Sequence, residues 1–197
     1  MSEPTPDGPA RFEHEVSAAR LGEPGLDEWA DLRTGPPLHP SLRALLPLVG
    51  TWRGVGKGGY PTINDFDYGQ QVRFAHDGRP FLSYEARAWL LDSTGSVLRP
   101  AAREVGWWRA GAEPDRFEVL LAHPTGLVEV YVGQARGPTQ WELSSDVVAR
   151  TASAKEVTAN HRLYGIVEGE LMYAIDMAAV GQPLIPHLSA RLTRIGG

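Results

Sequence analysis

The sequence predicts an all-β protein, an antiparallel up-and-down barrel of about ten strands with a short N-terminal helix before the first of them. Patterns of period two recur along most of the 197-residue chain, turn residues separate them at short intervals, and almost no stretch has the helical period. A meander of strands leaves two unpaired edges unless it closes, which favours a barrel. A barrel of this size is wide enough to hold a ligand in its lumen.

The N-terminal residues 1–38 differ in composition from the rest. They are rich in Pro, Gly and acidic side chains, and low hydrophobicity with excess negative charge does not favour an ordered core. We therefore expect a disordered or loosely docked acidic tail over 1–38 and a barrel domain over 39–197. Trp29 is the exception, and it is expected to dock a short helical piece from Leu26 to Leu32 on the domain or on a partner.

A short helix is expected between the tail and the first strand. Leu42, Leu45 and Leu46 fall at i, i+3 and i+4 after His39-Pro40, and Pro47 ends the turn. This piece is predicted to form a lid under the barrel.

The first strand carries alternate glycines, Gly50, Gly54 and Gly56, around Trp52. Because glycine has no Cβ, another backbone can come close, as a barrel corner requires. Trp52 is expected to plug one end of the barrel, burying about 200 Å². The spacing fits neither the dinucleotide-binding fingerprint nor the P-loop, so a phosphate-binding role is not favoured.

The later strands are predicted from alternation and turns. From Asp65 to His76 the aromatic and aliphatic side chains share one parity, and Asp77-Gly78 is a strong hairpin turn. Further strands are predicted at 80–91, 101–109, 117–123, 127–134, 140–149, 155–166, 171–178 and 186–195.

Composition limits the function classes. With 19 Lys and Arg against 24 Asp and Glu, the net charge of −5 gives no electrostatic reason to expect nucleic acid or an anionic membrane as a partner. No apolar run approaches the roughly 18 residues of a membrane span, and no secretory signal pattern begins the chain, so a cytoplasmic location is expected. The absence of cysteine excludes disulfides, thiolate metal sites, thioether-attached haem and cysteine nucleophiles.

Candidate chemical residues are few. The carboxylates show no catalytic pair, and no histidine spacing predicts a zinc site. His14 and His39 lie in the tail or at its end and are expected to be solvated. His123 precedes a turn and suits a capping role, while mid-strand His161 fits either face of the sheet.

His76 and His187 remain. His76 shares the parity of its apolar neighbours and is expected to point inward at a barrel mouth. His187 opens the last strand with parity opposite to Leu188, and parity alone does not decide which face is the lumen. An exposed histidine at the strand entry is one interpretation. The other is an axial haem ligand, because a neutral imidazole on a rigid element beside an apolar cavity suits that role.

Six sequence blocks carry a family resemblance. They are Gly50-x-Trp52-x-Gly54-x-Gly56, Gly59-Tyr60-Pro61-Thr62-Ile63, Phe74-Ala75-His76-x-Gly78-x-Pro80-Phe81, Leu121-Ala122-His123-Pro124-x-Gly126, Ala154-Lys155-Glu156-Val157-Thr158 and Val180-Gly181-Gln182-Pro183-Leu184-x-x-His187-Leu188. The first block alone is only moderately specific, because lipocalin-like barrels share Gly-x-Trp. In this order, over about residues 39–195, the six blocks resemble the nitrobindin family.

The resemblance implies a lipocalin-like barrel that binds one ferric haem b per chain, with His187 as the proximal axial ligand of the iron. It also implies isomerisation of peroxynitrite to nitrate and reversible binding of nitric oxide. Lys155 matches a position associated with haem binding, and His76 lies on the block that approaches the distal side. The acidic tail lies outside the family pattern.

Two other functions use the same barrel. One is a carrier that holds a fatty acid or another apolar molecule without chemistry. The other is a nitric oxide or haem sensor whose tail recruits a partner through Trp29. In each case the expected ligands are small molecules, and a homodimer is left open.

Overall fold

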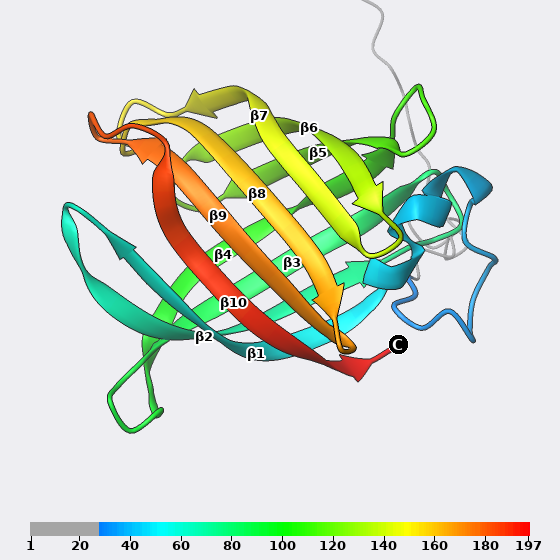
Figure 1. Ribbon diagram of the computed structural model, residues 1–197, viewed down its shortest axis with the longest axis horizontal. Helices are drawn as coiled ribbons and strands as arrows, with labels where there is room; N and C mark the ends of the chain where they lie inside the picture. The colour runs from blue at the N-terminus through cyan, green and yellow to red at the C-terminus, as the bar shows by residue number, and fades with distance from the viewer. Residues whose placement is uncertain (1–27) are drawn as a thin grey trace, which may run out of the picture.

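The computed structural model describes residues 28–197 and confirms a closed antiparallel barrel (Figure 1). Each strand pairs with its neighbours in sequence, and pairing of β1 with β10 closes the barrel. The ten strands are β1 (Gly50–Tyr60), β2 (Ile63–Ala75), β3 (Phe81–Leu91), β4 (Val97–Ala110), β5 (Arg116–His123), β6 (Leu127–Gly137), β7 (Gln140–Arg150), β8 (Val157–Val167), β9 (Glu170–Ala179) and β10 (Ile185–Gly196).

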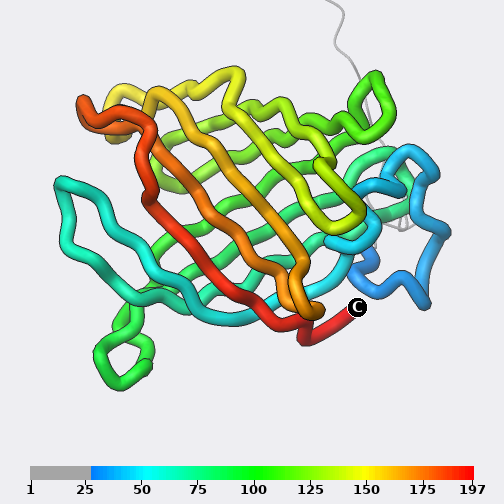
Figure 2. The backbone as a smooth tube through the Cα atoms, in the orientation of Figure 1, coloured from blue at the N-terminus to red at the C-terminus, as the bar shows by residue number. Residues whose placement is uncertain are grey.

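The two ends of the barrel differ. The 3-10 helix η2 (Pro40–Leu48) lies across one end, which we call the capped end (Figures 1 and 2). The β1–β2 hairpin, the β3–β4 loop and the β9–β10 connection lie at the opposite end, which we call the mouth. Because the strands run up and down, β10 begins at the mouth and β2 ends at the capped end.

The lid predicted from the leucine spacing forms as a 3-10 helix, but two details of the prediction are wrong: Leu46 is 43% exposed, and the helix continues through Pro47 to Leu48. With three residues per turn, the buried face takes every third residue. Leu42, Leu45 and Leu48 are buried under the barrel. Trp52 is 1% exposed, and its indole Nε1 donates to the Leu48 carbonyl at 2.9 Å. Trp141 donates in the same way to the Ala44 carbonyl at 2.8 Å. The lid is thus fixed by apolar packing and by two buried indole donors, each with its partner.

The glycines of β1 allow a close approach to β10. A Cβ on Gly54 would overlap the Arg191 carbonyl oxygen and lie 2.9 Å from the Leu192 Cα atom. Both neighbours are backbone atoms and cannot rotate away. The Gly-x-Trp-x-Gly-x-Gly motif therefore closes the barrel seam and seats Trp52, as its glycine pattern predicts.

The segment before η2 packs against the capped end. Trp29 and His76 exchange two backbone hydrogen bonds, of 2.7 and 2.9 Å, in an isolated antiparallel bridge. The side chain of Glu28 accepts from Ser83 at 2.8 Å. Backbone contact with the barrel thus begins before residue 39, the expected domain boundary. Trp29 docks in an extended bridge, so the expected helical piece is wrong for the described part of it; residues 1–27, and Leu26 with them, lie outside the described residues.

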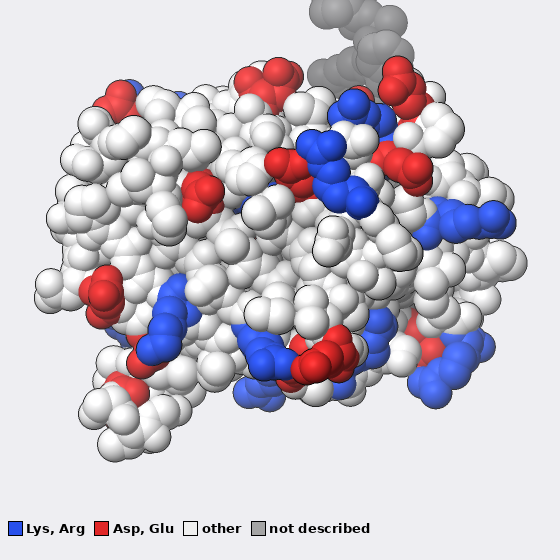
Figure 3. All heavy atoms as spheres, viewed as in Figure 1, with Lys and Arg blue, Asp and Glu red and all other residues white. Residues whose placement is uncertain are grey.

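Aromatic rings fill the capped half of the lumen. Trp108 is 1% exposed and stacks on Phe117 at 5.3 Å, with Phe74 against it edge to face at 5.4 Å. Toward the mouth from this packing, the lumen holds a cavity of about 520 Å³. On the outer face shown in Figure 3, the middle of the surface over β8 to β10 carries few charges. Among the described residues, no helix has the length and apolar character of a membrane span.

Candidate functional site

A β-bulge turns His187 into the lumen. Pro186 pairs with Asp176 and Leu188 with Ile175, so β10 has one residue more than β9 between these two pairs. Simple alternation from the buried Ala190 would point His187 outward. A bulge re-aims the extra side chain, and His187 and Leu188 both line the same cavity. The structure thus decides the question that parity left open.

Two contacts orient the His187 ring. Its Nδ1 lies 3.0 Å from the Gly59 carbonyl oxygen, which can only accept, so Nδ1 carries the proton. The Tyr60 ring packs against the imidazole edge to face at 5.4 Å. Tyr60 is itself fixed, because its hydroxyl accepts from the Ala179 amide at 2.9 Å and donates to the Met177 carbonyl at 3.0 Å. Among residues 28–197 no hydrogen bond occupies Nε2 of His187, so its lone pair is available to a ligand.

The cavity beside His187 has a volume of about 520 Å³, within the roughly 300–1,000 Å³ of small-molecule and cofactor sites. Apolar side chains that line it include Phe66, Ala86, Ala88, Leu90, Ile175 and Leu188. Its polar lining includes Tyr68, Gln70, Tyr84, Glu104, Arg162, Tyr164 and Tyr173. Two larger hollows, of about 890 and 1,140 Å³, include outward-facing residues such as Lys57 and are not confined to the lumen. The 1,140 Å³ hollow shares His187 and Leu188 with the 520 Å³ cavity. We therefore assign the site to the 520 Å³ cavity.

A buried charge cluster forms part of the polar wall. The Arg162 side chain is 4% exposed and donates to both carboxylate oxygens of Glu104 at 3.0 Å each. It also donates to Glu129 at 3.2 Å and, through Nε, to the Tyr131 hydroxyl at 2.9 Å. His123 lies 2.8 Å from Glu129 through Nε2. The cluster thus ties β4, β5, β6 and β8 together through one guanidinium.

Burial and charge act in opposite directions on these carboxylates. Burial by itself raises the pKa of Glu104, but the Arg162 charge and hydrogen bonds outweigh it and lower that pKa to about 2. Burial also raises the pKa of Glu129, but the hydrogen bond from His123 and the charge of Arg162 outweigh it and lower that pKa. Both groups are therefore carboxylates at neutral pH. Residue spacing did not reveal this cluster, although charged residues at inward parity within apolar strands were a usable signal.

The tyrosines of the cavity are neutral hydrogen-bonding groups. Tyr68 and Tyr173 share a hydroxyl contact of 2.7 Å, and the Tyr173 hydroxyl donates to Gln70 at 2.5 Å. Burial raises the pKa of Tyr68 to about 12, and burial also raises the pKa of Tyr173 well above its usual value. The site thus presents phenols, not phenolates, at neutral pH.

His76 does not join this site. It ends β2 at the capped end, where it is 1% exposed and bridged to Trp29, whereas His187 lies at the mouth. It is absent from the cavity lining. Its side chain points inward, as its parity predicts, but it lies at the capped end and not at the mouth, where it was expected. A haem contact of His76 stays a prediction.

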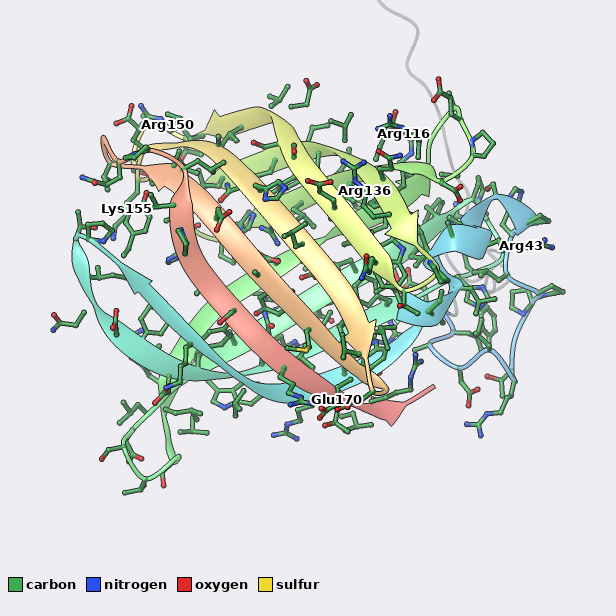
Figure 4. All side chains as sticks on the ribbon, viewed as in Figure 1. Arg43, Arg116, Arg136, Arg150, Lys155 and Glu170 are labelled. Atoms are coloured by element: carbon green, nitrogen blue, oxygen red, sulfur yellow. The ribbon has the colours of Figure 1, made fainter. Side chains whose placement is uncertain are left out.

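Lys155 lies at the mouth, in the exposed connection between β7 and β8 (Figure 4). It shares that end of the barrel with His187 but does not line the cavity. His161 faces outward between Glu142, at 2.9 Å, and Asp176, at 3.7 Å. His39 caps η2, and His14 lies outside the described residues. Within residues 28–197 no group of three or more His, Asp or Glu side chains is arranged to hold a bare metal ion.

The fold and the site define a small-molecule-binding antiparallel β-barrel, with one oriented imidazole in an otherwise tyrosine-rich and apolar lumen. Comparison with known proteins makes this class specific. A family model described as the THAP4-like, heme-binding beta-barrel domain matches residues 41–194. The chain therefore belongs to this family of haem-binding barrels, and the predicted membership in the nitrobindin family is confirmed.

Individual relatives agree. A peroxynitrite isomerase from Salinispora arenicola (strain CNS-205) is 61% identical over 175 residues, which cover 87% of this chain and 89% of the relative. A ferric nitrobindin-like protein from Saccharopolyspora erythraea is 49% identical over 176 residues, covering 88% and 82%. The crystal structure of Rv2717c from M. tuberculosis matches with a TM-score of 0.72 at 42% identity, covering 80% of this chain and 98% of that one.

Proposed function

We propose that this protein is a haem-dependent peroxynitrite isomerase. Relatives that are 54–61% identical bear that name, and this chain spans 89–94% of their length. The observation that carries the proposal is His187, whose Nδ1 is held by the Gly59 carbonyl so that Nε2 is left for a metal. A partner on the second ring nitrogen is the usual way in which proteins orient a metal-bound histidine.

The residues present fit haem b. His187 Nε2 would bind the iron, and the apolar wall formed by residues such as Leu90, Ile175 and Leu188 would contact the porphyrin. The chain has no cysteine, so the haem would be held without thioether bonds. We propose one haem per chain in the ferric state, and Lys155 at the mouth as a further contact.

The chain has little to do in the chemical step itself. Peroxynitrite and nitrate contain the same atoms and carry the same charge, so no nucleophile or net proton has to come from the protein. A bound ferric haem supplies Lewis-acid polarisation of the peroxide bond. His187 contributes a ligand whose ring orientation and tautomer are fixed by its hydrogen bond to Gly59.

The proposal is tested by the decay of peroxynitrite in stopped flow and by the nitrate yield. The haem-loaded protein should accelerate the decay in proportion to its concentration and raise the nitrate yield, and His187→Ala should lose most of both effects. His161→Ala, on the outer face, is the matched control and should retain them. Equal rates in His187→Ala and the wild type would reject the proposal.

A carrier of a fatty acid or other apolar ligand would use the same cavity. That function gives no reason for His187 to be bulged inward and fixed through Nδ1, so we place it second.

Binding of nitric oxide, a sensor role for the tail, a homodimer and a cytoplasmic location stay predictions. The weakly charged face of Figure 3 is compatible with the homodimer.

A further inference from the structure

A second β-bulge points an arginine into the mouth. On β3, Arg87 and Trp89 are two residues apart, whereas their partners on β4, Arg103 and Pro100, are three apart. This extra residue on β4 changes the alternation set by the inward Glu104. Arg99 consequently pairs with Leu90, whose side chain faces the lumen, and both line the 520 Å³ cavity. Arg99 therefore faces the lumen at the mouth.

The Arg99 guanidinium is available to a ligand. Its one hydrogen bond within residues 28–197 goes to the neighbouring Pro100 carbonyl at 3.3 Å, and no carboxylate of that region forms an ion pair with it. Arg103, on the outer face of the same strand, is by contrast bound to Glu85 at 2.7 Å. A guanidinium beside an apolar cavity is suited to bidentate binding of a planar oxyanion.

We propose that Arg99 anchors a carboxylate of the bound cofactor at the cavity mouth. The inference rests on the proposed haem function, since each haem b carries two propionate groups. The same guanidinium chemistry would suit peroxynitrite or nitrate. Arg99 is exposed at the rim, however, where a propionate reaches solvent, and we assign it to the cofactor.

Two acidic groups also line the cavity. Glu104 is bound by Arg162 through both oxygens and also accepts from Tyr84 at 2.9 Å, so its charge is compensated. Asp65 lies at the mouth on β2, forms no ion pair among the described residues, and would repel a carboxylate. The wall that carries Arg99 therefore attracts a propionate, and the wall that carries Asp65 does not.

The test compares ferric haem with its dimethyl ester, in which both carboxylates are blocked. Dissociation of each porphyrin is followed by its transfer to an excess of an acceptor apoprotein, for the wild type, Arg99→Gln and the matched control Arg103→Gln. We expect Arg99→Gln to lose haem about tenfold faster at low salt, and Arg103→Gln to match the wild type. The ester should leave all three proteins at one rate, and high salt should reduce the effect on haem.

Three results would overturn the assignment. Equal haem dissociation from Arg99→Gln and Arg103→Gln is the first, and an equal acceleration for haem and its ester is the second, because it indicates a structural role. The third is unchanged haem dissociation with a raised KM for peroxynitrite, which would move Arg99 to substrate binding. Failure of the proposed function is recognised separately, from the absorption spectrum of the haem complex. That spectrum should change in His187→Ala if His187 binds the iron, and it should be the same in Arg99→Gln as in the wild type.

Discussion

Replacing Arg162 with Met tests what the buried charge cluster does. Arg162 is the only cation among the described residues within ion-pair distance of both Glu104 and Glu129, apart from His123 when that is protonated. Methionine keeps much of the side-chain volume but removes every donor. Two carboxylates would then face each other inside the barrel with their main counter-charge gone.

The expected loss is large. Removing one partner of a buried ion pair destabilises a protein by roughly 3–5 kcal/mol, against a typical total stability of about 5–15 kcal/mol. For a domain of this size, each kcal/mol lowers Tm by about 2–4 °C, so Arg162→Met should melt about 6–20 °C below the wild type. Arg103→Met, which breaks an exposed pair, should lose at most about 1 kcal/mol.

The pH dependence distinguishes this reasoning from a simple packing defect. In the wild type the pKa of Glu104 is lowered from 4.5 to about 2, so its contribution is present above pH 4.5 and is lost as the pH falls toward 2. In Arg162→Met the positive charge beside Glu104 is gone, so burial raises the pKa of Glu104 above its usual value. The variant therefore gains stability as the pH falls through that raised pKa. Denaturant unfolding at pH 7 and pH 4.5 should show the gap between the two proteins narrowing. A gap that stays constant, or one below about 1 kcal/mol at pH 7, would refute the account.

Two further predictions concern the seam and the docked N-terminal segment. Gly54→Ala should destabilise the barrel by about 2 kcal/mol or more in denaturant unfolding, because its Cβ meets the backbone of β10. Gly137→Ala is the control, because no atom lies within 4 Å of the new Cβ. Equal losses of stability in the two variants would contradict the seam argument. Burial lowers the pKa of His76 below 6.5, so the Trp29 contact is fully stable above pH 6.5 and weakens as the pH falls below it. Hydrogen exchange at the Trp29 and His76 amides should lose protection between pH 7 and pH 5, after correction for intrinsic rates, and unchanged protection would count against the linkage.

Most of the fold was accessible from sequence because alternation and turn chemistry are local. The strand from Asp65 to His76, for example, was predicted to within two residues of β2. The role of the β1 glycines also followed from local chemistry. The same locality explains why His76 was expected at the wrong end of the barrel, since parity gives the face of a strand but not the end of the barrel. Counting strands up and down from β1 would have placed His76 at the capped end.

The candidate site was less accessible because its decisive features break the alternation. His187 and Arg99 reach the lumen through bulges, and a bulge is defined by the pairing of two strands, which one strand's sequence does not contain. The Arg162 cluster gathers residues from four strands, and only the closed barrel brings them together. His187 was identified through the family resemblance, and the structure supplies the physical reason for its orientation.

The most direct test of the account is a titration of the protein with ferric haem, followed by absorption spectroscopy beside His187→Ala, with His161→Ala as the matched control. The wild type and His161→Ala should give one saturable Soret band at one haem per chain. His187→Ala should give a different band, and free imidazole should restore the wild-type spectrum by entering the vacated space. The same saturable band in His187→Ala and the wild type would contradict the assignment of His187 as the iron ligand.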